Sequence, residues 1–404
     1  MKSKLLLFVA PLIILVAALA TGFTLIWHLF VLSLLVLLVS YLWTFFSIRG
    51  LESYVKPLPK RCQVGESFNQ EITLFNRGKI PRLLLEAQEN TDVPGYHNVA
   101  AFSLSAEGYY GWETQVHCRK RGEYRLGSLT ITASDPFGLF QRRLNLSKPQ
   151  KIIVCPATLE LPLFEPLSHQ GTGYGPERWL ASIFGPNVAS VREYVAGDSL
   201  KRIHWRSTAH TSKLMVKIFD PDRTRKIARS VWVVADMHQP SHLAVGEEST
   251  EEYAITIAAS LIKKYVGEAL PVGLMASGDQ PYLFQPELGE PHLWHMLTVL
   301  ALAKATGNVP IDQLVSGESG RFGNESIVIV ITPSANERLA TSLRQLRSRG
   351  VVVVAILLDA ASFGGTTSVA NTARTLTSSA IQVHVVRRGD DLPVVLDSRE
   401  ASHI

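Results

Sequence analysis

The sequence predicts three structural parts: a transmembrane helical hairpin, an all-β immunoglobulin-like sandwich, and a C-terminal doubly wound α/β domain. Three observations support this fold class. Two apolar runs open the chain, short runs of alternating apolar residues follow, and fully apolar strands then alternate with amphipathic helices. We expect these parts to occupy residues 1–48, 51–155 and 191–404, with a linker over residues 156–190.

The first part consists of two apolar segments. Residues 5–20 are apolar throughout, and residues 23–46 are interrupted only by His28 and a few hydroxyl groups. About 20 residues cross the hydrocarbon core of a bilayer, so the second segment is long enough and the first is borderline. Only two residues separate the segments, which predicts a helical hairpin. The alternative is that residues 1–20 are a cleaved signal peptide, because a basic start and an apolar run precede a small-residue site.

Basic residues flank the hairpin on both sides and predict its orientation. Lys2 and Lys4 precede it, and Arg49, Lys56 and Lys60 follow it. Because positive charge concentrates on the cytoplasmic side of membrane segments, we expect both ends to face the cytoplasm. The predicted location is the cell membrane, with a multi-pass anchor and the soluble domains in the cytoplasm.

The second part has the sequence pattern of a β domain. Apolar residues alternate with polar ones over runs of seven to ten residues, and turn residues such as Gly78, Gly95 and Gly122 separate the runs. Such runs at this spacing are typical of an antiparallel sandwich. The predicted strands are 67–76, 82–90, 99–106, 112–120, 126–134 and 141–147.

Charge and cysteine content exclude some classes of protein. The net charge of +5 is a mild excess that the basic flanks of the hairpin can account for, so we expect no nucleic-acid partner. The cysteines, Cys62, Cys118 and Cys155, are far apart and form no CxxC motif. This sparse, odd number argues against a disulfide framework and fits a reducing compartment, with the thiols buried as apolar groups.

The third part alternates strands and helices, as a mainly parallel sheet requires. Ser249 or Thr250 is suited to cap the first helix, and Gly350 is suited to end the third. The predicted strands are 230–237, 272–277, 281–284, 326–332, 351–359 and 381–386, and the predicted helices are 249–267, 291–304 and 335–350. Ligands of such sheets bind beyond the carboxyl ends of the strands, where the loops begin at Asp236, Ser277, Thr332 and Asp359.

No motif in the chain predicts catalysis. The sequence contains no GxSxG, HExxH or P-loop pattern, and no histidine is paired with cysteine or aspartate at a telling spacing. The GxGxG at Gly171, Gly173 and Gly175 lies in a proline-punctuated linker, without the strand and helix that a dinucleotide site needs. We therefore expect a protein that is not an enzyme and holds no cofactor.

Residues 191–220, hereafter the signature segment, join the β part to the α/β part. A Gly-Asp turn at Gly197 and Asp198 leads into a short basic helix-like stretch from Leu200 to Arg206, and an apolar strand follows. One interpretation is a structural joint, in which Asp198 caps the helix and Trp205 packs against the sheet. The other is a docking face, in which basic side chains meet an acidic partner.

The signature segment and the Asp-Pro-Phe-Gly-Leu-Phe run at 135–140 resemble the domain-of-unknown-function 58 family. The resemblance covers residues 50–404, although His210 stands where the family more often has arginine. The candidate signature or interaction residues are Arg192, Glu193, Tyr194, Gly197, Asp198, Arg202, His204, Trp205 and Arg206. The resemblance implies a von Willebrand factor type A-like domain with a degenerate metal site. It also implies partnership with a MoxR-type AAA+ ATPase and with a membrane transglutaminase-like protein.

Asp236 is the weak candidate for a metal ligand. In von Willebrand type A domains, Asp-x-Ser-x-Ser at this strand end holds Mg²⁺ or Mn²⁺ through oxygen ligands. Here His238 and Pro240 replace both serines, and the later strand end at Thr332 lacks the family's aspartate. Our prediction is therefore a membrane-anchored, non-enzymatic scaffold or adaptor that works with a MoxR-type ATPase and binds no metal. The alternative is a Mg/Mn-dependent adhesion-type binding module that uses Asp236.

Overall fold

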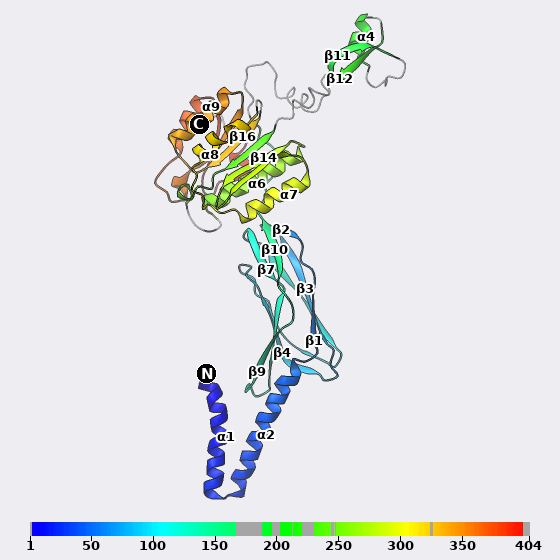
Figure 1. The fold of residues 1–404 in the computed structure, drawn as a ribbon, viewed down its shortest axis with the longest axis vertical. Helices are drawn as coiled ribbons and strands as arrows, with labels where there is room; N and C mark the ends of the chain where they lie inside the picture. Colours follow the sequence, from blue (N-terminus) through cyan, green and yellow to red (C-terminus); the bar gives the residue numbers. More distant parts are fainter. Residues whose placement is uncertain are drawn as a thin grey trace. The chain divides into compact units, whose positions relative to one another are not determined.

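The computed structural model describes residues 2–166, 188–195, 203–211, 213–219, 230–243, 246, 248–323 and 326–398. The chain divides into two compact units, Met1–Pro156 and Ala157–Ile404 (Figure 1). The many β-strands of the first unit and the α/β organisation of the second agree with the predicted order of fold classes.

Two helices begin the first unit. They are α1 (Lys2–Thr21) and α2 (Thr24–Ser47), and the turn between them contains Gly22 at φ +63°. Among the described residues, α2 alone is long and apolar enough to cross a membrane, with 24 residues and a hydropathy of 2.4. The apolar part of α1 covers only Val9–Thr21, so length and composition support one crossing.

The rest of the first unit is built from β-strands. These form three sheets, ordered β1-β3-β6, β5-β4-β8-β9 and β2-β10-β7. All neighbours pair antiparallel except β2 and β10. The strands are β1 (Leu51–Val55), β2 (Arg61–Gln63), β3 (Ser67–Asn76), β4 (Arg82–Asn90), β5 (Val99–Leu104), β6 (Tyr109–His117), β7 (Gly122–Leu126), β8 (Ser128–Ser134), β9 (Gln141–Asn145) and β10 (Gln150–Cys155).

The core of this unit explains the alternating pattern. Ile72 and Leu74 of β3, Leu85 of β4 and Ile131 of β8 are buried in one cluster, while the residues between them face outward or are half-buried. Ile48, directly after α2, belongs to the same cluster. The end of the apolar helix is therefore part of the core of the β unit.

The second unit contains one six-stranded sheet in the order β15-β14-β13-β16-β17-β18. Its strands are parallel except β15, which pairs antiparallel with β14. Its strands are β13 (Val231–Ala235), β14 (Val272–Ser277), β15 (Pro281–Glu287), β16 (Ile327–Thr332), β17 (Val352–Leu358) and β18 (Gln382–Val386), and its helices are α6 (Thr250–Gly267), α7 (Glu290–Leu302), α8 (Ile311–Gly317), α9 (Glu337–Ser348), α10 (Ala370–Ser378) and α11 (Leu392–Val395).

Helices cover both faces of this sheet. One core cluster joins Trp232 and Val234 of β13 to Leu343 of α9 and Ala373 of α10. Helix α6 contributes nothing to that cluster, yet it contacts β13, β14, β16 and β17, so it lies on the opposite face. Ser249 caps α6 as expected, because its hydroxyl oxygen accepts a hydrogen bond from Glu252 N.

The start of the predicted linker is not a linker. Leu161 and Phe164 are buried in the second unit, where Leu159 N donates to Ser260 Oγ at 2.9 Å and Glu165 N donates to Ser398 Oγ at 2.6 Å. The prediction fails here because the apolar side chains of this proline-rich stretch are buried in the core of the second unit. The remainder of the predicted linker, including its glycine run, lies outside the described residues.

Candidate functional site

The order of the strands brings two loops together at the centre of the sheet. Strands β13 and β16 are parallel neighbours, with Ala235 opposite Ile331. The chain leaves β13 toward α6 on one face and leaves β16 toward α9 on the other. Such a switch point is where ligands of doubly wound sheets bind. The residues that follow the two strand ends, Asp236 and Thr332, therefore define the first candidate site.

Asp236 makes all of its side-chain contacts within the protein. The residue is 1% exposed, Thr332 Oγ1 donates to its Oδ2 at 2.6 Å, and His238 N donates to its Oδ1 at 3.0 Å. Ser334 N donates in turn to Thr332 Oγ1 at 2.9 Å. Burial raises the pKa of Asp236, and the two hydrogen bonds to its carboxyl group oppose that shift.

Two histidines complete this buried network. His242 Nε2 lies 2.8 Å from the carbonyl oxygen of Asp236, which can only accept, so Nε2 carries the proton. The other ring nitrogen of His242 lies 3.1 Å from Thr250 Oγ1, at the start of α6. Burial lowers the pKa of His242 and favours the neutral ring. His238 Nδ1 lies 3.0 Å from Ser241 Oγ within the same loop.

The segment around Gly307 crosses the ends of β13 and β14 and forms backbone hydrogen bonds with the loop after β13. Gly307 N donates to the carbonyl oxygen of Met237 at 2.9 Å, and Gln239 N donates to the carbonyl oxygen of Gly307 at 2.9 Å. A Cβ atom on Gly307 would lie 1.8 Å from the carbonyl oxygen of Ser277, at the end of β14. Only glycine fits this crossing, and it covers the ends of β13 and β14.

The residues at this edge do not fit a Mg²⁺ or Mn²⁺ site. Asp236 and Thr332 do meet, but His238 and Pro240 supply no hydroxyl groups. No group of three or more His, Cys, Asp or Glu side chains within the described ranges could hold a metal. About six oxygen ligands suit such a cation. The geometry instead makes Asp236 the cap of its own strand end.

The described parts of the signature segment form a small ribbon. Strand β11 (Val188–Glu193) pairs antiparallel with β12 (Met215–Phe219), and α4 (Trp205–Thr211) precedes β12 (Figure 1). We call residues 188–195, 203–211 and 213–219 the signature ribbon. The backbones of Arg192, Glu193 and Arg206 belong to these elements, whereas Gly197, Asp198 and Arg202 lie outside the described residues.

The helix of the signature ribbon begins later than predicted. Ile203 bridges Val216 of β12, and His204 N donates to the carbonyl oxygen of Met215 at 2.8 Å, so this stretch is extended. His204 is then the capping residue, because its Nδ1 accepts from Ser207 N at 3.1 Å. The prediction of a helix from Leu200 is wrong at these positions. The predicted cap, Asp198, is among the residues not described.

Apolar side chains of the signature ribbon are exposed. Trp205 is 68% exposed, and Val195 and Leu214 are exposed as well. Tyr194 N donates to the carbonyl oxygen of Leu214 at 2.8 Å, which places Leu214, the residue before β12, beside the end of β11. Trp205 is therefore not buried within the signature ribbon. Its indole ring is available for contact.

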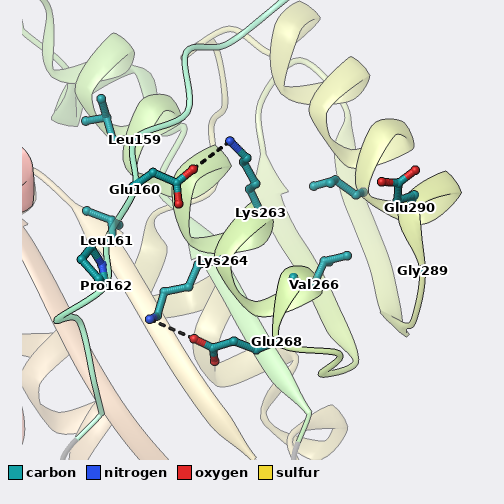
Figure 2. A pocket seen from close by; sticks show the side chains of 12 residues that line it. Leu159, Glu160, Leu161, Pro162, Lys263, Lys264, Val266, Glu268, Gly289 and Glu290 are labelled. Carbon is teal, nitrogen blue, oxygen red and sulfur yellow. Dashed lines mark hydrogen bonds and ion pairs between the residues drawn. The ribbon is translucent and has the colours of Figure 1, made fainter.

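A second candidate site lies at the opposite edge of the sheet (Figure 2). A pocket of about 580 Å³ opens between residues 159–162, the end of α6 and the start of α7. Both of its lysines are paired with glutamates: Lys263 Nζ lies 3.1 Å from Glu160 Oε1, and Lys264 Nζ lies 2.9 Å from Glu268 Oε1. This arrangement offers a ligand no unpaired lysine and no activated nucleophile.

The cysteines are also unsuited to chemistry. Cys62, Cys118 and Cys155 are buried free thiols, and the sulfur atoms of Cys62 and Cys118 lie 2.9 Å apart. Burial raises the pKa of all three thiols, which disfavours the nucleophilic thiolate. The prediction that Cys62 and Cys118 are buried is confirmed.

Some residues of the candidate sites were not predicted. His242 and Gly307 have no motif around them, and only the strand order shows that they meet the loop after β13. Thr332 was expected at a strand end, but its contact with Asp236 depends on β13 and β16 being neighbours.

Comparisons with known proteins give a match to one family model and one distant relative. Residues 190–362 match the model of the family described as "Protein of unknown function DUF58". Uncharacterized protein YeaD of Bacillus subtilis (strain 168) is 24% identical over 201 residues, which is 50% of this chain and 48% of that protein. The match thus spans about half the length of that curated relative.

The likeness to solved structures is confined to small parts of the chain. The CARDB domain of PF1109 from Pyrococcus furiosus is 16% identical, with a TM-score of 0.20, and the match covers 26% of this chain and 94% of that one. A chain of the human complex of zinc 2-glycoprotein and prolactin inducible protein is 7% identical, with a TM-score of 0.21 and coverage of 26% and 92%. Such scores carry no argument. The family model matches the part of the chain that contains the signature segment, so residues 190–362 are similar to the DUF58 family, as the resemblance read from that segment predicts.

Proposed function

We propose that the protein is a membrane-anchored, non-enzymatic adaptor that works through protein–protein contacts of its signature ribbon. In this proposal α1 and α2 form a multi-pass anchor in the cell membrane, and both soluble parts face the cytoplasm. The finer fold types belong to the same proposal: an immunoglobulin-like sandwich for the β unit and a von Willebrand type A-like domain for the α/β unit.

The observation that carries the proposal is the exposed apolar surface of the signature ribbon. Trp205 is 68% exposed, and Val195 and Leu214, which is joined to Tyr194 by a backbone hydrogen bond, are exposed beside the same strands. Tryptophan is prominent among residues that dominate protein interfaces, because one ring buries a large area. A folded ribbon that leaves such a ring in water is suited to a partner.

The remaining candidate sites favour contact over chemistry. The carboxyl group of Asp236 is buried and fully hydrogen-bonded, and the pocket beside α6 pairs its lysines with its glutamates. Catalysis requires a nucleophile, acid or base that can reach a substrate. At the switch point the carboxyl group is buried, and in this pocket both lysines are held in ion pairs.

The partner we propose is a MoxR-type AAA+ ATPase, with a transglutaminase-like membrane protein as a further member of the assembly. The support is the family resemblance carried by residues such as Tyr194, His204 and Trp205. An adaptor fixed in the membrane would hold the ATPase at the bilayer surface, where membrane proteins are within its reach.

A pull-down tests this function. The full-length protein, in detergent micelles, is used to capture the co-encoded MoxR-type ATPase, and Trp205→Ala is compared with Leu288→Ala. Leu288 is a matched control, because it is another exposed apolar residue of the second unit. We expect strong capture by the wild type and by Leu288→Ala, and roughly tenfold weaker capture by Trp205→Ala. Equal capture by all three proteins, or none by the wild type, would refute the proposal.

A further inference from the structure

A pocket lies where α2 joins the β unit. Its volume is about 270 Å³, and its walls include Leu42, Trp43 and Phe46 of α2, Ile80 and Pro81 of the turn between β3 and β4, and Arg82, the first residue of β4. Helix α2 enters the unit beside β4 and β9 (Figure 1), and it contacts β4, β8 and β9. We call this the juxtamembrane pocket, because it borders the final turns of the apolar helix.

Arg82 is a buried cation without an anion. It is 5% exposed, and its Nη2 donates to the carbonyl oxygen of Arg49 at 2.9 Å, just beyond the end of α2. Its Nε is buried with no hydrogen-bond acceptor, and no carboxylate within residues 2–166 forms an ion pair with it. Burial lowers the pKa of Arg82. A buried charge is costly unless it is paired, so the pocket wall has the chemistry to receive an anion.

Trp43 adds a second unused donor to the same wall. Its Nε1 is buried and has no hydrogen-bond partner. Buried indole N–H groups usually find an acceptor, and Trp is common where a membrane protein meets the lipid headgroups. Arg82 and Trp43, each with a donor that has no acceptor, therefore line the pocket together with Ser47 and apolar side chains.

The surroundings of the pocket are those of a membrane interface. The neighbouring turns and strand ends expose Ile80, Leu83, Leu84, Tyr109 and Phe137. The guanidinium groups of Arg49 and Arg142 lie over the ring of Phe45, at 4.3 and 5.1 Å from its centroid. Apolar and aromatic side chains interspersed with arginine suit the boundary between acyl chains and headgroups.

The Asp-Pro-Phe-Gly-Leu-Phe run belongs to this interface. The carboxyl group of Asp135 is buried, with Oδ2 accepting from Phe137 N at 3.0 Å and Oδ1 accepting from Phe140 N at 2.6 Å. The turn that results exposes Phe137 and brings Phe140 into edge contact with Tyr41 of α2, with ring centroids 5.9 Å apart. Asp135 thus shapes a loop that borders the apolar helix.

We propose that the juxtamembrane pocket binds the headgroup of an anionic phospholipid from the bilayer that α2 crosses. The lipid phosphate pairs with Arg82 and accepts from Trp43, and the glycerol and acyl carbons lie along Leu42, Phe46 and Ile80. The apolar walls select a lipid over free phosphate, because a small hydrated anion gains nothing from them. The inference rests on the proposed membrane anchoring, since only a protein inserted through α2 would place the pocket at this depth.

Native mass spectrometry of the full-length protein tests the proposal. The protein is reconstituted into nanodiscs of equal phosphatidylglycerol and phosphatidylcholine, released into detergent, and scored for the lipid that remains bound. We expect one phosphatidylglycerol per chain in preference to phosphatidylcholine, and no displacement by millimolar glycerol phosphate. Displacement by glycerol phosphate would show a general phosphate site. Equal retention of both lipids would show an apolar surface without selectivity for the headgroup. Either result refutes the proposal.

Three variants locate the site. Arg82→Gln is expected to reduce phosphatidylglycerol retention roughly tenfold, because a charge-assisted bond is lost. Ile80→Glu keeps Arg82 but places a carboxylate at the exposed rim, so it is expected to have a similar effect without disturbing the core. Arg77→Gln is the control, since Arg77 is an exposed neighbour paired with Glu52 at 2.9 Å. Wild-type retention by Ile80→Glu would overturn the assignment even if Arg82→Gln misfolds. Failure of the wild type to enter nanodiscs would instead refute the membrane anchor itself.

Discussion

The candidate residue at the switch point of the sheet and the candidate residue of the signature ribbon differ in their exposure to solvent. At the switch point, Asp236 is 1% exposed and both carboxyl oxygens accept hydrogen bonds from the protein. In the ribbon, Trp205 is 68% exposed. The comparison teaches that a polar residue at the expected binding position can serve the fold, while an apolar residue elsewhere remains available to a partner.

Removing the Asp236 side chain is the substitution with the largest expected effect. Asp236→Ala leaves Thr332 Oγ1 and His238 N without their acceptor in a buried site, so we expect a loss of about 3 kcal/mol in the free energy of unfolding. Hydrogen exchange of the β13 and β16 peptides in urea, measured on the full chain, reports that loss. Less than about 1 kcal/mol would show that the network is not structural.

The second-largest expected effect is a fall in the free energy of unfolding of the second unit on acidification. Burial lowers the pKa of His384, whose Nδ1 lies 3.1 Å from the carbonyl oxygen of Val395. In the unfolded chain the pKa of this histidine is 6.5, so below pH 6.5 the unfolded state binds more protons than the folded state. The contribution of His384 to stability is therefore fully present above pH 6.5 and is lost as the pH falls toward the lower pKa of the folded state. The lowered pKa of His242 also makes the folded state less stable as the pH falls. The raised pKa of Asp236 has the opposite effect at pH values above 3.8, the pKa of this group in the unfolded chain.

His384→Gln isolates this effect, because a glutamine side chain keeps hydrogen-bonding groups and does not titrate. We expect the variant to lose less stability than the wild type between pH 7 and pH 5, with exposed His295→Gln as the control. Hydrogen exchange of the β18 peptide, corrected for intrinsic rates, measures the change. An identical pH dependence in His384→Gln and the wild type would contradict the assignment of a buried neutral ring.

Divalent cations are expected to have a smaller effect still. The donors around Asp236 and Thr332 do not complete a site for Mg²⁺ or Mn²⁺, so millimolar addition or chelation should change stability by less than about 0.5 kcal/mol. Isothermal titration calorimetry with the full chain should show no binding heat. Heat that disappears in Asp236→Ala would revive the adhesion-type alternative.

Trp205→Ala is expected to have the smallest effect on stability. An exposed side chain adds little to the folded state, so the free energy of unfolding should change by less than about 0.5 kcal/mol. The same hydrogen-exchange measurement on the β11 and β12 peptides checks this value. A loss near 2 kcal/mol would make Trp205 a structural residue and return the signature segment to the role of a joint.

Strongly periodic segments of the fold were predictable. The limits of β3, β4 and β14 agree with the predicted runs, and Ser249 caps α6 as its sequence indicates. Short elements were missed: β2 has three residues, too few for a period, and α8 has seven residues after Pro310. Their structure depends on neighbours along the sheet or helix layer, which a local pattern does not show.

The candidate sites were predictable in kind and less so in detail. Asp236 and Thr332 were expected at strand ends, but their hydrogen bond follows from the adjacency of β13 and β16, which is a property of the sheet order. The helix expected from Leu200 begins at Trp205, because Ile203 pairs with Val216. Arg82 had no motif, and its role depends on burial that only the folded unit shows.

Photocrosslinking at position 205 tests the central claim most directly. A photoreactive phenylalanine analogue replaces Trp205 in the full-length protein in cells, and a second variant carries it at Leu288. The account predicts that the co-encoded MoxR-type ATPase crosslinks at position 205 and not at position 288. Crosslinking at position 288 alone, or none at position 205 when both proteins are present, would contradict it.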